Sequence, residues 1–404
     1  MTNLNRHLAR TSALMSALLL SSFSVAMAQD TTAPAPAAPA SAAMTTPAMA
    51  GPISANPNPF SFDTSDWLGD AGGKIYVGGA ISGLAYYQAN PTKTAPGDVS
   101  SYMDLTNAQI TLQKTDGWLQ FYVQAGDYSF PTVGTPYTKS SSATPSSFGV
   151  VPVAYIKLQG EGDWADWSIE GGKLPTLTGD EYNFTFENMN IERGLLWNIE
   201  PAISRGVQVN YANGPLTLSL SWNDGYYSNV LNTLSGLASY VFSPSDTLAF
   251  SASGDVAGAH FSLLDSGSIY DLIWTHTDGN WVFSPYLQYS VTPSVGTFVH
   301  GTNETGAAFL TSYSFDDNWK MAGRFEYESS TGSHIATAPN IIGFGAGSNA
   351  WEFTLTPTFT YKLFFVRADV SYISTGSGTV GDLFGTSGKV GDQTRVMLET
   401  GVVF

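Results

Sequence analysis

Few residues of this sequence have the types and spacing that catalysis requires. After residue 28 the histidines stand alone in the sequence, at His260, His276, His300 and His334. The sequence has no His-x-x-x-His pair, no cysteine and no glycine-rich phosphate loop before a helical pattern. His276 has Asp271 and Ser268 nearby, but isolated histidines are more often structural or solvated than catalytic. We therefore expect no enzyme activity, no cofactor and no metal site.

The arginines have a more informative distribution. After residue 28 they are Arg193, Arg205, Arg324, Arg367 and Arg395. The last three stand at polar positions of segments that alternate polar and apolar residues, and such alternation puts the two sets on opposite faces of a β-strand. Arg324, Arg367 and Arg395 are therefore expected to form a basic wall on one face of the strands. The carboxylates of Asp166, Glu170 and Glu326 are expected to lie across from this wall. Two interpretations stay open: a wall of charges that orients water and selects ions, or ordinary salt bridges that stiffen the sheet formed by these strands.

Alternating segments of this kind recur along most of the chain. From about Gly73 onward, short runs with a two-residue period are separated by Gly, Asn, Asp and Pro. About sixteen candidate strands begin near Lys74, Val99, Trp118, Gly149, Asp163, Ile203, Pro215, Leu234, Asp246, Gly267, Asn280, Thr305, Asn318, Asn349, Phe364 and Gln393. Tight turns such as Asn213-Gly214 alternate with longer connections, among them 129–148 and 329–348.

The composition indicates what the apolar faces of these strands contact. Only 12% of the residues are charged, about half the usual share in soluble domains. After residue 28 the sequence has no apolar run long enough for a transmembrane helix, so the chain can cross lipid only as a closed barrel. Aromatic residues near strand ends are expected to form girdles at the membrane boundaries: Tyr86, Tyr87, Trp164, Trp167, Tyr226, Tyr227, Trp281, Trp319 and Trp351. We predict an all-β fold, a closed antiparallel transmembrane β-barrel of about 16 strands over residues 73–404.

The N-terminal part of the chain predicts export. Arg6 and Arg10 precede a short apolar stretch that ends in Ala26-Met27-Ala28, which is typical of a cleaved signal peptide over residues 1–28. Residues 29–72 are expected to form a flexible linker rich in Ala, Pro and Thr. Without Arg6 and Arg10, 14 basic residues remain against 33 acidic ones, a net charge of about −19. This charge argues against a nucleic-acid partner and predicts a mild preference for cations.

Several motifs resemble one protein family. The stretch from Gly171-Gly172-Lys173 to Asp180-Glu181 is followed by Arg193-Gly194-Leu195-Leu196-Trp197-Asn198 and by Leu218-Ser219-Leu220-Ser221-Trp222. This block is similar to the central region of the OmpL-like β-barrel porin type 2 family. Ser82–Pro91 is similar to the family's opening strand, which usually has an acidic residue where Leu84-Ala85 stand here, and Arg324-Phe325-Glu326-Tyr327 resembles a later strand.

The resemblance implies a porin of the Gram-negative outer membrane, with a water-filled channel for passive diffusion of small hydrophilic solutes and ions. The C-terminal Phe404 is the ending by which outer-membrane proteins resemble one another, and the barrel-assembly machinery reads it in that class. The other expected partners are outer-membrane lipid and further copies of the chain in a homotrimer. An outer-membrane barrel enzyme would need a Ser/His/Asp group at the rim, whereas a structural or adhesin barrel would have a lumen filled by side chains.

Two sets of charged residues are candidates for the channel site. The expected pore-lining residues are Lys157, Asp166, Glu170, Arg324, Glu326, Arg367, Asp369, Arg395 and Glu399. The candidates for a constriction lie in the stretch 176–198 and are Asp180, Glu181, Glu187, Glu192 and Arg193. The loop from Ser129 to Phe148 is a second segment that could fold inward, and the sequence does not decide between the two.

Overall fold

The computed structural model describes residues 60–92, 98–258, 264 and 266–404, and most of this part of the chain forms one antiparallel sheet. The expected signal peptide and the linker up to residue 59 lie outside the described residues. Among the described residues, no helix is both long and apolar enough to cross a membrane.

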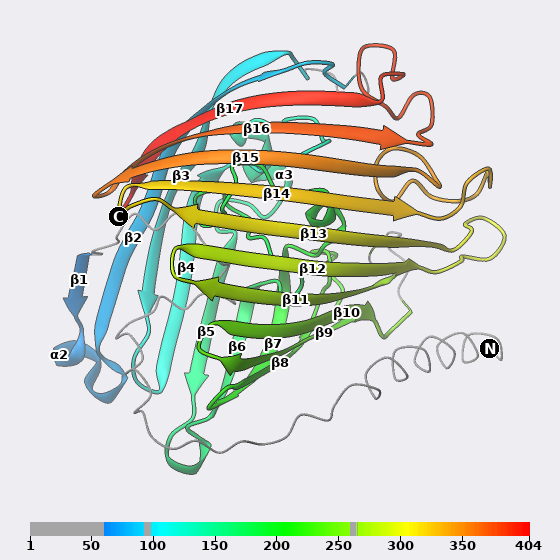
Figure 1. Cartoon of the computed structure of the whole chain (residues 1–404). Helices are drawn as coiled ribbons and strands as arrows, with labels where there is room; N and C mark the ends of the chain where they lie inside the picture. The colour runs from blue at the N-terminus through cyan, green and yellow to red at the C-terminus, as the bar shows by residue number, and fades with distance from the viewer. Residues whose placement is uncertain (1–59, 93–97, 259–263, 265) are drawn as a thin grey trace. The chain divides into compact units, whose positions relative to one another are not determined.

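Sixteen strands close into a barrel, which confirms the predicted fold (Figure 1). They are β2 (Lys74–Gln88), β3 (Ser101–Lys114), β4 (Leu119–Tyr128), β5 (Val153–Gln159), β6 (Trp167–Pro175), β7 (Ile203–Asn213), β8 (Leu216–Asn223), β9 (Thr233–Ser243), β10 (Asp246–Asp255), β11 (Ser268–Asp278), β12 (Trp281–Thr292), β13 (Thr302–Ser314), β14 (Trp319–Ser330), β15 (Asn349–Tyr361), β16 (Phe364–Gly376) and β17 (Asp392–Val403). Each pairs with its neighbours in sequence, and β17 pairs with β2 to close the ring.

The connections between strands differ at the two ends of the barrel. At one end, which we call the short-turn end, the strands are joined by residues 115–118, 160–166, 214–215, 244–245, 279–280, 315–318 and 362–363. The first residues of β2 and the last of β17 lie at the same end. At the other end the strands are joined by longer segments, of which 129–152, 176–202, 331–348 and 377–391 matter most below.

Two-residue alternation separates an outer apolar face from an inner polar one. On β16 and β17 the outward Val370 and Leu398 are 47% and 51% exposed, whereas the inward Asp369 and Glu399 are fully buried. Outer aromatic residues gather near the strand ends, including Trp164, Trp167, Trp281, Trp319 and Trp351. Of the other expected girdle residues, Tyr87 is exposed, but Tyr86 points inward and is buried against Tyr137. Tyr226 and Tyr227 lie in the connection after β8 and are half-buried.

The last part of the expected linker is folded. Residues Phe60–Asp63 form a short strand, β1, followed by the helical turns α2 (Ser65–Leu68) and η1 (Gly69–Ala71). β1 pairs with Lys74–Val77, the part of β2 that β17 leaves uncovered. Phe60-Ser61-Phe62-Asp63 alternates apolar and polar residues, which is typical of a strand. The prediction of a linker rested on the average composition of 29–72, and this average hides so short a pattern.

The two faces of β8 provide a test of this arrangement. Leu220 faces outward and is 54% exposed, whereas Ser219 faces inward and is half-exposed. We expect Leu220→Arg to lower the free energy of unfolding by about 2–4 kcal/mol, since it puts a charge against lipid. The matched variant Ser219→Arg should cost much less. Urea titrations in lipid vesicles, followed by tryptophan fluorescence, would measure both, and equal costs would contradict the assignment of faces.

Candidate functional site

The connection between β6 and β7, residues 176–202, lies inside the barrel, and we call it the inward loop. It contains two short 3-10 turns, η3 (Thr185–Glu187) and η4 (Leu196–Ile199). Its contacts reach inner faces of strands on different sides of the barrel. Gly179 donates its N–H to Asp271 on β11 at 3.0 Å, and the Asn190 amide donates to the Thr356 hydroxyl on β15 at 2.6 Å.

Two arginines of the barrel wall hold this loop. Arg324 on β14 donates to the Glu181 carboxylate at 2.7 Å and to the Glu192 carbonyl at 2.5 Å. Arg367 on β16 donates to the backbone carbonyls of Thr185 and Asn188 at 2.6 and 3.0 Å. The same arginines also pair with carboxylates of neighbouring strands: Arg324 with Glu352 at 2.7 Å and Arg367 with Glu399 at 2.7 Å.

The third arginine connects two loops. Arg395 on β17 forms a salt bridge with Glu192 of the inward loop. It also donates to the carbonyls of Thr132 and Thr135, in the 129–152 connection, at 3.1 and 2.7 Å. The two segments contact each other directly, because Val133 donates its N–H to the Arg193 carbonyl at 2.9 Å. Both loops that the sequence singled out therefore fold inward.

Carboxylates of the wall accept hydrogen bonds from the loop backbone. Asp369 accepts the N–H groups of Ile191 and Glu192 at 3.0 and 2.9 Å. Glu326 accepts the N–H of Leu195. These groups and the arginines thus fasten the loop to β14–β17.

Burial divides the expected site residues into two groups. Those that fasten the loop are almost completely buried: Glu181, Glu192, Arg193, Arg324, Glu326, Arg367, Asp369, Arg395 and Glu399. The others are half-exposed: Lys157, Asp166, Glu170, Asp180 and Glu187. Lys157 and Glu170 stand opposite each other on β5 and β6, and Asp166 lies at the turn before β6, so none of them is on the strands that carry the three arginines.

Arg193 lies beside two aromatic rings. Its guanidinium lies 5.7 Å from the ring centre of Phe130 and 5.4 Å from that of Trp197. None of its side-chain nitrogens has a hydrogen-bond partner among the described residues. Burial lowers the pKa of Arg193 to about 10, since the loop removes the charged form from water.

The wall carries further buried carboxylates that were not among the expected pore-lining residues. They are Asp271, Glu304, Glu328 and Glu352, together with Glu200 of the inward loop. Among these, only Glu352 has a salt bridge within the described part of the chain. Glu304, Glu328 and Glu352 stand on the inward phase of β13, β14 and β15, so the alternation that located the arginines could also have located them.

Nearer the short-turn end the inner face is polar and accessible. Inward side chains that are half-exposed there include Gln113, Lys157, Glu170, Asn210, Ser219, Ser239, Thr275 and Lys320. They come from strands around the barrel, from β3 to β14. The inner face is therefore polar and partly exposed in this half, whereas loops pack inside the other half.

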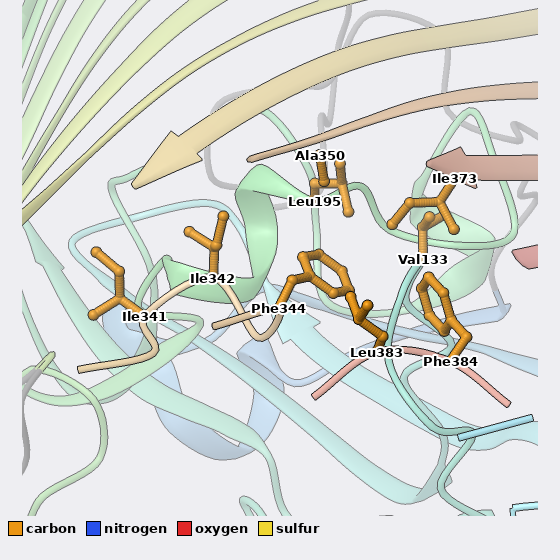
Figure 2. Close-up of a cluster of buried hydrophobic side chains, with 9 residues drawn as sticks. All are labelled: Val133, Leu195, Ile341, Ile342, Phe344, Ala350, Ile373, Leu383 and Phe384. Atoms are coloured by element: carbon orange, nitrogen blue, oxygen red, sulfur yellow. The ribbon is translucent and has the colours of Figure 1, made fainter. Parts of the chain in front are cut away.

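The long-loop half contains an apolar cluster that joins the loops to one another (Figure 2). Its residues come from four connections and from β15 and β16: Val133, Leu195, Ile341, Ile342, Phe344, Ala350, Ile373, Leu383 and Phe384. The rings of Phe344 and Phe384 are 5.7 Å apart. Apolar burial thus adds to the polar contacts that hold the loops inside the barrel.

His276 and Asp271, which the sequence analysis considered as possible catalytic residues, do not lie together. His276 faces outward on β11 and contacts Asp246 at 2.6 Å, whereas Asp271 faces inward and contacts the inward loop. Across the residues that the structure describes, no three His, Cys, Asp or Glu side chains are arranged to hold a metal ion.

Asp369 provides a test of how the loop is held. Asp369→Ala would leave the N–H groups of Ile191 and Glu192 without acceptors, at a cost of about 1–3 kcal/mol each. We expect faster cleavage of the folded protein after Glu187 by a glutamate-specific protease. Asp317→Ala, in an exposed turn, is the matched control. Unchanged cleavage in the Asp369 variant would show that this anchor does not hold the loop.

Solved structures share this architecture. A loop-deletion form of OmpT, an outer membrane protein of Vibrio cholerae, is 10% identical with a TM-score of 0.55, over 82% of this chain and 99% of that one. The anion-selective porin from Comamonas acidovorans is 12% identical with a TM-score of 0.55, over 82% and 99%. Salmonella typhi OmpF, in a complex with daunomycin, is 15% identical with a TM-score of 0.54, over 82% and 98%. At these identities the likeness concerns the fold.

The family comparison covers nearly all of the barrel. No curated protein matches the sequence. Residues 74–404 match the family described as β-barrel porin-2, OmpL-like. The closed barrel, its apolar outer face and its polar interior agree with that match. This protein, a porin-like barrel of the outer membrane, belongs to the β-barrel porin-2, OmpL-like family.

Proposed function

We propose that the barrel is a channel through which small hydrophilic solutes and ions diffuse passively across the outer membrane. The observation that carries this proposal is the set of half-exposed polar side chains on the inner faces of strands between β3 and β14, from Gln113 to Lys320. In a purely structural barrel, side chains or loops would be expected to fill the lumen along its whole length. We also infer that the protein has no enzymatic activity, because His276 and Asp271 stand on opposite faces of β11.

The inward loop is the proposed constriction. It crosses the interior between the inner faces of β11 and β17, where its Gly179 and Glu192 are bound. Of its charged residues, Asp180 and Glu187 are only partly buried, so we propose that they come closest to a passing solute. Glu181, Glu192 and Arg193 are buried and position the loop.

We further propose that the channel prefers cations. The wall arginines are paired with carboxylates, so their charges are compensated locally. Asp180, Glu187, Glu200, Asp271, Glu304 and Glu328 have no such counter-ion within the described residues. Of these, Asp180 and Glu187 are the less deeply buried, and above pH 7 their negative charges raise the local concentration of cations over that of anions.

The proposals on export and assembly rest on the chain ends. Cleavage after Ala28 would release the exported chain beginning at Gln29. The C-terminal Phe404 is the proposed recognition point for the barrel-assembly machinery. A homotrimer is the proposed assembly, supported by the trimer form in which the similar Vibrio cholerae OmpT is known.

Electrical recording tests the channel directly. Purified folded protein added to a planar bilayer in KCl should give stepwise current increases. A folded protein that gives no steps would instead indicate a structural barrel.

Ion selectivity tests the charges at the constriction. In a tenfold KCl gradient the zero-current potential should have the sign of a cation-preferring channel. The double variant Asp180→Asn/Glu187→Gln should move this potential toward zero, because it removes two accessible negative charges. Asp317→Asn, in an exposed turn, should leave the potential unchanged. A wild-type potential with the opposite sign would refute the proposed preference.

The same two carboxylates predict a dependence on pH. Burial, together with the neighbouring Glu181, raises the pKa of Asp180 to about 7. Burial also raises the pKa of Glu187 to about 7, opposed in part by a backbone hydrogen bond and by Arg193. Lowering the pH from 8 to 6 should therefore protonate both groups and weaken the cation preference. The Asp180→Asn/Glu187→Gln variant should show a smaller change over this range, and an equal change would assign the titration to other groups.

A further inference from the structure

The folded segment that precedes the barrel, residues 60–72, has an apolar surface that the channel does not use. In the register of β1, Phe60 lies opposite Val77 and Phe62 lies opposite Ile75. Residues opposite each other on paired strands point to the same side of the sheet. Val77 is paired with Leu112, which is on the outer face of β3. Phe60 and Phe62 therefore point outward, and they are 69% and 37% exposed.

The turn after β1 is held in place and presents two more apolar side chains. Thr64 is buried and donates both its N–H and its hydroxyl to the Gly73 carbonyl, each at 2.9 Å. A Cβ atom at Gly72 would come within 2.5 Å of the Ser65 Cα, so the chain closes tightly here. Between these points, α2 exposes Trp67 at 77% and Leu68 at 52%. Such exposure is costly in water, because large apolar side chains gain from leaving it.

This surface is continuous with the lipid-facing surface of the barrel. β1 follows the end of β17 along the same edge of β2, at the short-turn end (Figure 1). The next strand round the barrel, β16, begins there with Phe364, which is 43% exposed. Tyr361, at the end of β15, is 56% exposed. The apolar side chains before the barrel thus extend an aromatic belt already present on its outer face.

We propose that residues 60–72 form a membrane-interface anchor, in which Phe60, Phe62, Trp67 and Leu68 insert into the phospholipid leaflet at the short-turn end. Aromatic rings favour the boundary between acyl chains and water. The polar residues of the segment suit the same depth, since Asp66 and Asp70 are exposed and can stay among the headgroups. The anchor also covers the backbone edge of β2 that β17 does not reach.

The absence of cysteine from the chain allows a direct test. Trp67→Cys, Phe62→Cys and Ser61→Cys would each carry one nitroxide spin label, and Ser61 is the matched control because its register points inward, opposite Tyr76. The proteins would be folded into phosphatidylethanolamine/phosphatidylglycerol vesicles. Accessibility to oxygen, which concentrates in lipid, and to a water-soluble nickel chelate would be measured by electron paramagnetic resonance.

We expect the ratio of oxygen to nickel-chelate accessibility to be several-fold higher at positions 62 and 67 than at position 61. A ratio at positions 62 and 67 no higher than at position 61 would overturn the proposal, because the segment would then face water. Dipolar broadening between labels on different copies would also overturn it, since it would assign the surface to a contact between subunits. Heat-modifiable migration on gels would show that each variant is folded, and channel conductance gives a separate reading on the proposed function.

Discussion

The structure depends on the hydrogen-bonded seam between the first and last strands of the barrel. In hydrocarbon every backbone N–H and C=O needs a partner within the protein, so a sheet with a free edge is excluded. β17 meets this requirement by pairing with β2 from Arg395–Gln88 to Val403–Ala80. Beyond the strand, Phe404 and Gly79 exchange two backbone hydrogen bonds of 2.9 and 3.0 Å. The seam fixes the ring, and the ring fixes which side chains face the interior.

The same requirement extends to the loops inside the ring. The inward loop has little regular secondary structure, so many of its backbone groups need partners from elsewhere. Arginine offers five donors in a rigid plane and can serve a carboxylate and several carbonyls at once. Arg367 does this with Glu399 and with the carbonyls of Thr185 and Asn188. Pairing also offsets the cost of burying these charges, which would be several kcal/mol for an isolated ion.

The sequence predicts the barrel well because its signal is local. Alternation with a period of two needs only neighbouring residues, and it indicated both the strands and the inward direction of Arg324, Arg367 and Arg395. The partners of these arginines lie far away in the chain, as with Glu181 and Glu192, and no local pattern encodes such contacts. The sequence therefore did not predict the path of the inward loop. In the segment before the barrel, by contrast, a local pattern was present but not used. The average composition of 29–72 concealed the alternation at Phe60–Asp63, which forms a strand.

The long-range partners of the arginines also determine how much their charges contribute to the electrostatics of the interior. The arginines were the obvious candidates for a basic wall, but their guanidinium groups are occupied by the loop and by carboxylates. A charge that is paired and buried contributes little to the field at a distance, because its partner cancels it. Asp180 and Glu187 of the inward loop have no such salt bridge among the described residues, and they are less buried than the residues that fasten the loop, so we expect them to contribute most to the field at the proposed constriction. The proposed cation preference therefore rests on these two loop carboxylates rather than on the positions of the arginines.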